Sequence, residues 1–385
     1  MQGIYPFSIF EKPITMKIAV CTLLFLSAGR CLAQSDSSTE NIFIITTDGF
    51  RWQEVFNGAD YALTRNAKYV QDTSLLKQLY WDSTAPLRRE KLMPFLWNTV
   101  AKQGRIYGNR LYHNYSNVSN LYKISYPGYN EMLTGYPDPL FIPNVPLRNR
   151  NTNILEYLNE ETQYKGHVAA FSSWNIFSAI LNKKRSRLPG SLGYERLMND
   201  SNVNTDMINE MQDNEQEKKH TRYDLFTYLC AREYIETKHP KVVLIGFGET
   251  DEFAHNGRYD LYLQQATNID KMISDLWYLV QTTPYYKNKT TFLITTDHGR
   301  GRSPDTWFKH GILTKGSGET WFAIIGPSIS GDGEMTNKSQ FYQKQMASTI
   351  AHILGKEFQT SDNQANIIPV SATVKYNIAF AKETK

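Results

Sequence analysis

The sequence has no hydrophobic run long enough to cross a membrane. A spanning helix needs about 20 mostly apolar residues, whereas the apolar run at residues 18–26 is much shorter. This run follows Lys17 and precedes Ala33, a small residue suited to signal-peptide cleavage. We therefore predict that residues 1–33 are a cleaved export signal. Residues 1–15 would then be an upstream extension from a misassigned start codon.

Cysteine is scarce, with three in 385 residues. Cys21 and Cys31 fall in the predicted export signal, so Cys230 remains alone and the mature chain can form no internal disulfide. An exported chain without disulfides is typical of bacteria rather than of a eukaryotic secretory pathway. We predict a periplasmic or secreted bacterial protein. Lipidation of Cys31 is the alternative, although Arg30 before it fits that motif poorly.

The sequence also lacks a strong excess of charge of one sign. The formal net charge is +4, and the predicted export signal contributes two of these positive charges. Such a balance argues against a general nucleic-acid surface and leaves a small-molecule partner, anionic or neutral, open. The hydrophobic content of 41% supports a large core in one catalytic domain, residues 34–385.

Several short apolar runs predict strands that are buried on both faces, because hydrophobic and polar residues do not alternate in them. They are residues 41–47, 167–171, 242–247 and 291–296. Helical segments, including an amphipathic stretch at residues 259–280, lie between them. This alternation predicts an α/β fold with a mostly parallel sheet and helices on both faces. The charged stretch at residues 176–240 is a candidate cap insertion.

Potential metal ligands follow three of these runs. They are Asp48 after the first, Asp251 and His255 after the second, and Asp297 and His298 after the third, with His310 further on. In open α/β sheets the site lies beyond the carboxyl ends of the strands, so these side chains are expected to converge. Mixed Asp/His sets suit zinc. A single Asp after a strand is often only a helix cap or turn residue, but the full ordered set indicates a metal site.

Ser125 is the candidate nucleophile. Residues 125–135 predict a helix with a serine cap, an early proline and a terminal glycine. At a helix start the hydroxyl lies among unpaired amides and the positive end of the helix dipole, which favours an alkoxide and an anionic substrate. The competing interpretation is that Ser125 is only an N-cap, and the neighbouring metal ligands favour the nucleophile.

The ordered set of Asp48, Ser125, Asp251-x-x-x-His255, Asp297-His298 and His310 resembles the alkaline phosphatase superfamily. The nucleotide pyrophosphatase/phosphodiesterase branch is the most similar. Residues 47–51, Thr-Asp-Gly-Phe-Arg, resemble its first-strand motif, and residues 125–137 resemble its nucleophile segment, which usually has threonine at the place of Ser125. The resemblance runs from about residue 41 to the C-terminal region and implies an alkaline-phosphatase-like fold.

The resemblance also implies two zinc ions and a division of the ligands. One ion would be held by Asp251, His255 and His310, and the other by Asp48, Asp297 and His298 with Ser125 reaching it. Ser125 would attack phosphorus, and water would hydrolyse the phosphoseryl intermediate. The asparagine that touches a phosphate oxygen in this branch lies about twenty residues after the nucleophile. Asn144 is the best candidate and Asn149 the second.

The implied function is an exported two-metal hydrolase of phosphoric esters, a phosphodiesterase or phosphatase. A sulfatase is the nearest rival, but Thr47 and Tyr129 stand where that branch has an aspartate and an arginine, and His298 replaces its asparagine. A phosphoryl transferase or mutase is the other alternative. A non-catalytic binding protein is opposed by the intact ligand set.

The choice between monoester and diester depends on the surroundings of the phosphate. The family often has Asn-His after the nucleophile's proline, whereas this chain has Gly128-Tyr129. Nothing in this segment offers a cation for a monoester dianion, although the basic run at residues 183–187 is a candidate. The aromatic residues Tyr126, Tyr129 and Trp174 would instead stack on a nucleoside or aryl group. We therefore expect diesters to be accepted at least as well as monoesters.

Overall fold

The centre of the fold is strand β1 (Asn41–Thr47), in which every residue is buried. The computed structural model describes residues 39–140, 144–198, 202–215, 218, 220–359 and 366–370. The predicted export signal at residues 1–33 lies outside this part of the chain. No helix within these described ranges is both long and apolar enough to cross a bilayer.

An eight-stranded sheet surrounds β1, in the order β10-β2-β9-β7-β1-β6-β4-β5. Only β9 runs antiparallel to its neighbours, so the predicted mostly parallel sheet is confirmed. Its other strands are β2 (Gly104–Tyr107), β4 (Val168–Ser172), β5 (Gly190–Leu192), β6 (Val242–Phe247), β7 (Thr290–Thr295), β9 (Phe322–Ile325) and β10 (Gly333–Glu334). A second, three-stranded sheet contains β11 (Ser339–Tyr342), β3 (Asn114–Asn117) and β8 (Glu319–Thr320).

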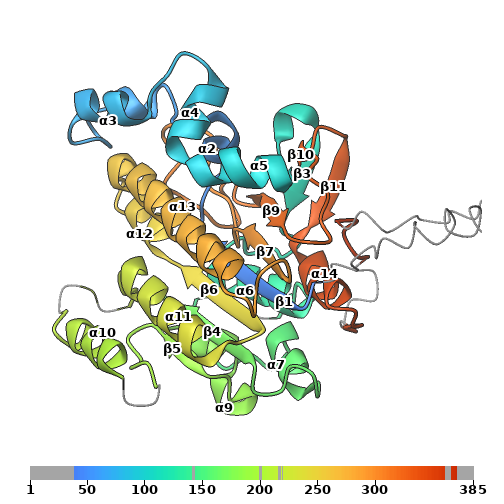
Figure 1. The fold of residues 1–385 in the computed structure, drawn as a ribbon. Coiled ribbons are helices and arrows are strands. Elements are labelled where there is room, and N and C mark those ends of the chain that lie inside the picture. Colours follow the sequence, from blue (N-terminus) through green and yellow to red (C-terminus); the bar gives the residue numbers. More distant parts are fainter. Residues whose placement is uncertain are drawn as a thin grey trace, which may run out of the picture. The chain divides into compact units, whose positions relative to one another are not determined.

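Helices cover both faces of the large sheet, as predicted (Figure 1). The α-helices are α2 (Trp52–Asn57), α3 (Thr73–Tyr80), α4 (Ala85–Leu92), α5 (Ala101–Gln103), α6 (Ser125–Thr134), α7 (Ile154–Glu160), α8 (Phe177–Ile180), α9 (Lys183–Ser186), α10 (Val203–Asp213), α11 (Asp224–Lys238), α12 (Glu249–His255), α13 (Tyr259–Thr282) and α14 (Met346–Ile353). Short turns of other helix types are η2 (Leu63–Arg65), η3 (Leu96–Val100), η4 (Arg110–Tyr112) and η5 (Gln343–Gln345).

Two hydrophobic cores sandwich the sheet, because successive side chains of a strand point to opposite faces. Phe43 and Ile45 pack in the core that includes α11 and α13. Ile42 and Ile44 pack in the other core, with α6, α7 and α14. This explains why the sequence of β1 is apolar without alternation.

The predicted cap insertion at residues 176–240 is too broad. Strand β5 pairs in parallel with β4 at the edge of the central sheet, and α11 packs on β4, β5 and β6. These two elements are integral layers of the fold. Their charged residues lie on the solvent-facing side of elements that belong to the central layers. Composition alone cannot distinguish such elements from a cap insertion.

A buried carboxylate joins α13 to the segment before η3. Asp270 is almost completely buried and accepts hydrogen bonds from the backbone N–H groups of Phe95 (2.7 Å) and Leu96 (3.0 Å). Burial raises the pKa of Asp270 from 3.8 to about 7, although both hydrogen bonds oppose the rise. The folded protein therefore binds a proton at Asp270 in a pH range where the unfolded chain has released it.

Replacing Asp270 with Asn should remove this pH dependence. A folded-state pKa above the unfolded value means that Asp270 contributes less stability as pH rises from about 4 to about 7. The free energy of unfolding of wild type, relative to Asp270→Asn, should fall through this window and be flat above it. Urea unfolding at several pH values measures the difference. Asp275→Asn, at an exposed position of α13, is the matched control; a constant difference between wild type and Asp270→Asn would contradict the assignment.

Candidate active site

The carboxyl ends of β7, β1 and β6 lie side by side and position five of the six predicted metal ligands. These strands are parallel neighbours, so their ends meet at one edge of the sheet. Asp48 directly follows β1. Helix α12, which begins soon after β6, carries Asp251 and His255. Asp297 and His298 follow β7.

Asp48, Asp297 and His298 form a first ligand group, in which one potential ligand atom of each lies within 4.8 Å of the others. The Nε2 atom of His298 is 3.4 Å from Asp48 Oδ1 and 3.5 Å from Asp297 Oδ2. Its Nδ1 donates to the carbonyl oxygen of Gly299 at 2.9 Å. Because Nδ1 makes this bond, Nε2 is the ring nitrogen that faces the two carboxylates and would ligate a bound ion.

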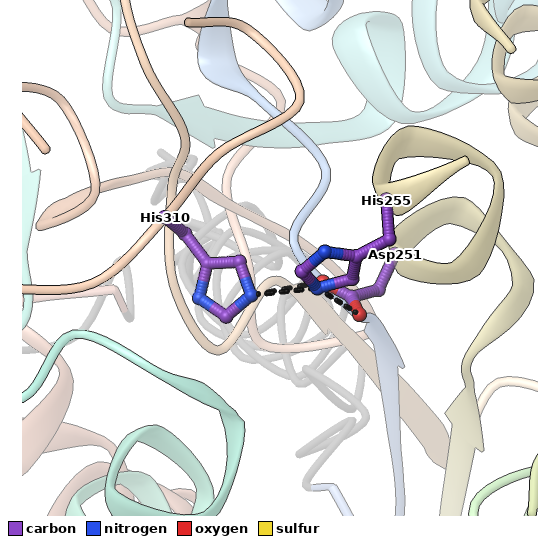
Figure 2. Close-up of side chains that lie close together, drawn as sticks. All are labelled: Asp251, His255 and His310. Atoms are coloured by element: carbon purple, nitrogen blue, oxygen red, sulfur yellow. Dashed lines mark hydrogen bonds and ion pairs between the residues drawn. The ribbon is translucent and has the colours of Figure 1, made fainter. Parts of the chain in front are cut away.

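Asp251, His255 and His310 form a second ligand group by the same measure. The Nε2 atoms of His255 and His310 face each other at 2.9 Å, and His255 Nε2 is 3.2 Å from Asp251 Oδ2 (Figure 2). His310 comes from a separate loop, which is tied to the nucleophile segment where its Nδ1 lies 3.4 Å from the carbonyl oxygen of Lys123. Two ring nitrogens and a carboxylate that point at one space form a suitable set for a divalent cation.

The two ligand groups adjoin. Asp251 Oδ1 of the second lies 3.8 Å from His298 Nε2 of the first. The rings of His298 and His310 stack, with centroids 4.1 Å apart and planes 16° from parallel. All six ligands expected from the sequence are therefore brought together at one site.

Ser125 opens helix α6 beside the first ligand group. Its Oγ lies 3.3 Å from Asp48 Oδ1 and 3.3 Å from His298 Nε2. The prediction that Ser125 is the helix N-cap is wrong, because the N-cap is Ile124 and Ser125 is the first helical residue. The hydroxyl is thus directed at the ligands rather than at the helix backbone.

Asn144 satisfies an amide at the start of α6. Its Oδ1 accepts a hydrogen bond of 2.9 Å from the backbone N–H of Tyr126, and Asn144 lines the same cavity as Ser125. Asn149, the second candidate, is buried and donates to Asn130 Oδ1 at 2.9 Å. The structure therefore places Asn144, and not Asn149, beside the predicted nucleophile.

Gly128 and Tyr129, which depart from the family pattern, both contact the site. A Cβ at Gly128 would lie 2.5 Å from the carbonyl oxygen of Asp297, so a side chain there would force α6 away from the ligands. The hydroxyl of Tyr129 donates to Asp48 Oδ2 at 3.1 Å. Burial, together with Asp297 and Asp48, raises the pKa of Tyr129 well above its ordinary value, so the hydroxyl keeps its proton. Sequence reasoning missed this role, although Tyr129 lies one helical turn after Ser125.

Tyr126 and Tyr129 cannot stack on a substrate, contrary to the prediction. Both are completely buried, and the hydroxyl of Tyr126 donates to the carbonyl oxygen of Leu147 at 2.6 Å. Trp174 is the one of the three predicted aromatic residues that lines the cavity.

The cavity at the site has a volume of about 260 Å³. It is lined by Asp48, Ser125, Asn144, Trp174, Thr221, Gly248, Asp251, Glu252, His255 and Asn256. None of these is a lysine or arginine. Lys183 and Arg185 of the basic run instead pair with Glu195 and Glu156.

Arg300 is a buried cation that positions ligands. Its guanidinium pairs with the carboxylate of Asp251 and donates to the carbonyl oxygens of Gly49 (3.0 Å) and Phe308 (2.7 Å). Burial lowers the pKa of Arg300 to about 9, so it remains charged at neutral pH. Two other arginines that flank the ligand motifs also pair with carboxylates, Arg51 with Glu54 and Arg302 with Glu319.

Helices α11 and α12 cap each other, which fixes the helix that carries two ligands. The Asp224 carboxylate accepts from the backbone N–H groups of Gly248 (2.8 Å) and Glu249 (3.3 Å). The Glu249 carboxylate accepts in return from the N–H of Asp224 (2.7 Å) and pairs with Lys218 (2.6 Å). Burial, with the charge of Glu249, raises the pKa of Asp224.

The charges at the site fit bound cations. Asp297 Oδ2 is buried and has no hydrogen-bond partner among the described residues. Burial and the nearby Asp48 carboxylate raise the pKa of Asp297. Burial lowers the pKa of His298, but the two carboxylates outweigh it and raise the value to about 9. Burial and neighbouring cationic groups lower the pKa of His310, which favours the neutral, ligating ring. Crowded carboxylates that raise the pKa of His298, beside the neutral ring of His310, are therefore a fitting set for divalent metal ions, which would take the place of the bound protons.

No protein-family model matches the sequence, and neither does any curated protein. Solved structures match along most of its length. The alkaline phosphatase PafA is 9% identical over 83% of this chain and 96% of its own, with a TM-score of 0.53. The lipoteichoic acid synthase LtaP from Listeria monocytogenes is 10% identical over 84% and 74%, with a TM-score of 0.51.

The phosphonate monoester hydrolase SpPMH from Silicibacter pomeroyi is 11% identical over 86% of this chain and 75% of its own, with a TM-score of 0.51. At these identities the likeness concerns the fold. The chain therefore shares the fold of the alkaline phosphatase PafA, of LtaP and of SpPMH.

Proposed function

We propose that this protein is an exported two-zinc hydrolase of phosphoric esters that acts through a phosphoseryl intermediate on Ser125. The observation that carries the proposal is the position of the Ser125 hydroxyl, 3.3 Å from both Asp48 and His298 at the first ligand group. Its hydrogen-bond partners within the described part of the chain are these two candidate ligands. A serine held this way is available to attack.

The chain's own residues have separable roles in this proposal. Asp48, Asp297 and His298 would hold one zinc ion, and Asp251, His255 and His310 the other. The bound metals supply Lewis acidity for charge that develops on phosphate oxygens. Ser125 Oγ forms the new bond to phosphorus as the leaving oxygen departs, and water later hydrolyses the phosphoserine. Tyr129 holds the carboxylate of Asp48 in place, and Arg300 holds that of Asp251.

Asn144 is the proposed donor to a non-bridging phosphate oxygen. Its Oδ1 is occupied by the Tyr126 N–H, which orients the amide and leaves the Nδ2 hydrogens for a substrate oxygen. Among the described residues that line the cavity, Trp174 is available for an ester group, and none is a lysine or arginine that could meet a second phosphate charge. This wall supports a preference for diesters.

The metal assignment is tested by elemental analysis after dialysis. Wild type should hold close to two zinc ions per chain, because each ligand group offers carboxylate oxygen and imidazole nitrogen. His255→Ala, in the second group only, should hold close to one. Chelation should lower activity at least tenfold, and zinc should restore it. An active preparation that contains only calcium would refute zinc.

The nucleophile is tested with Ser125→Ala. Its kcat/KM on a nitrophenyl diester should fall by about 10³-fold or more, since the attacking oxygen is lost. Zinc content and circular dichroism should stay as in wild type. Ser125→Thr should keep part of the activity because it keeps a hydroxyl, and Ser348→Ala on α14 is the matched control. Wild-type turnover in Ser125→Ala would mean that water attacks phosphorus directly.

The reaction class is tested with matched nitrophenyl esters. We expect kcat/KM for the diester to equal or exceed that for the monoester and to exceed that for the sulfate by at least about 100-fold, since two dications suit the charge of a transferring phosphoryl group. Trp174→Ala should lower kcat/KM more for an aryl diester than for its methyl analogue. A higher value for the sulfate would overturn the class, and a strong preference for the monoester would overturn the diester assignment.

A further inference from the structure

Large aliphatic side chains are exposed on the three loops that surround the predicted nucleophile. We call them the apolar rim: Leu121, Leu140, Val145, Leu147, Ile312 and Leu313. Their exposed fractions range from 36% to 94%, the highest being that of Leu313. Single exposed aliphatics are common, but these six lie within a few residues of Ser125, Asn144 or His310 in the sequence.

Hydrogen bonds join the three loops into one surface. The hydroxyl of Tyr122, next to Leu121, donates to the carbonyl oxygen of Pro139, next to Leu140, at 2.9 Å. Tyr126 connects α6 to the segment that carries Val145 and Leu147, because its hydroxyl donates to the carbonyl oxygen of Leu147 at 2.6 Å.

The loop that carries Ile312 and Leu313 is tied to the loop that carries Leu121. The Nδ1 of His310 lies 3.4 Å from the carbonyl oxygen of Lys123. A Cβ built on Gly311 would be 3.9 Å from the Ile124 side chain. The apolar rim is thus held next to the start of α6, whose first residue, Ser125, lines the cavity.

The charges between these aliphatic side chains are all of one sign. The described residues of the rim loops, 121–124, 139–140, 144–148 and 309–315, include Lys123, Arg148, Lys309 and Lys315 but no aspartate or glutamate. Among the described residues, no carboxylate forms an ion pair with any of these four cations. Within this part of the chain no carboxylate neutralises their charge.

We propose that the apolar rim is a docking surface for an anionic lipid bilayer. Exposed aliphatic side chains interleaved with unpaired cations are the combination that binds peripheral proteins to membranes: the aliphatics enter the headgroup boundary while the cations attract anionic lipids. A protein partner would fit less well, since interface cores are enriched in aromatic residues and arginine and depleted in lysine. Docking through the rim would turn the cavity toward the bilayer. The use of lipid phosphoesters as substrates, but not the docking itself, rests on the proposed function.

The test uses the chain from Gln34, which retains the whole compact unit that begins at Ser38. It lacks Cys21 and Cys31, so the buried Cys230 is its one native thiol. An environment-sensitive dye attached to Leu313→Cys should shift its emission to the blue on phosphatidylcholine vesicles that contain about 30–40% phosphatidylglycerol. Val203→Cys, on α10 and 83% exposed, is the matched control and should not shift. The added Ser125→Ala change should leave the shift intact, which separates docking from catalysis.

Flotation of the unlabelled chain with the same vesicles gives the binding strength. Leu121→Ser combined with Leu313→Ser should weaken binding at least about fivefold, while Val203→Ser should bind as wild type. Pure phosphatidylcholine vesicles or high salt should also weaken it. Failure of Leu313→Cys to shift on anionic vesicles would overturn the proposal, as would equal binding of wild type and the double serine variant. Self-association through the rim without vesicle binding would overturn it in favour of a dimer interface.

Discussion

The crowding of carboxylates at one edge of the sheet is the constraint on which the site depends. Asp48 and Asp297 are both buried at the ends of the neighbouring strands β1 and β7, where water does little to screen them. Asp251 at the adjoining group is neutralised in part by Arg300. Arg300 and a protonated His298 offset only part of this negative charge, and Asp297 Oδ2 has no hydrogen-bond partner among the described residues, so the site is suited to divalent cations.

Holding these groups together requires support from helices that sequence motifs do not mention. Helix α6 approaches the Asp297 backbone only because residue 128 is glycine, and the approach brings Tyr129 within reach of Asp48. Helix α12 is held by reciprocal capping with α11 through Asp224 and Glu249. These contacts fix the ligands before any metal binds. Buried polar groups are destabilising when they have no partner, and here their hydrogen bonds orient the site.

Much of this could be predicted from sequence because the signals are local. The buried strands stand out as apolar runs without alternation, and β1 and β6 match their predicted bounds at residues 41–47 and 242–247. The six ligands were found because each lies just after a strand or in a short motif. The ends of neighbouring parallel strands must meet, so the grouping followed from the fold class together with the family resemblance.

What could not be predicted depends on contacts between distant segments. The side chain of Asn144 accepts a hydrogen bond from the Tyr126 N–H at the start of α6. This contact joins residues far apart in the sequence, whereas the local sequence favoured Ser125 as the cap of this helix. Burial of Tyr126 and Tyr129 is likewise a property of packing, since an aromatic residue beside a nucleophile looks the same in sequence whether it faces the substrate or the core. Lys183 and Arg185 of the basic run pair with Glu195 and Glu156, and no local sequence pattern identifies these partners. The apolar rim is the same case in reverse. Each of its aliphatic residues is ordinary in the sequence, and the contacts between their loops bring them together as one surface.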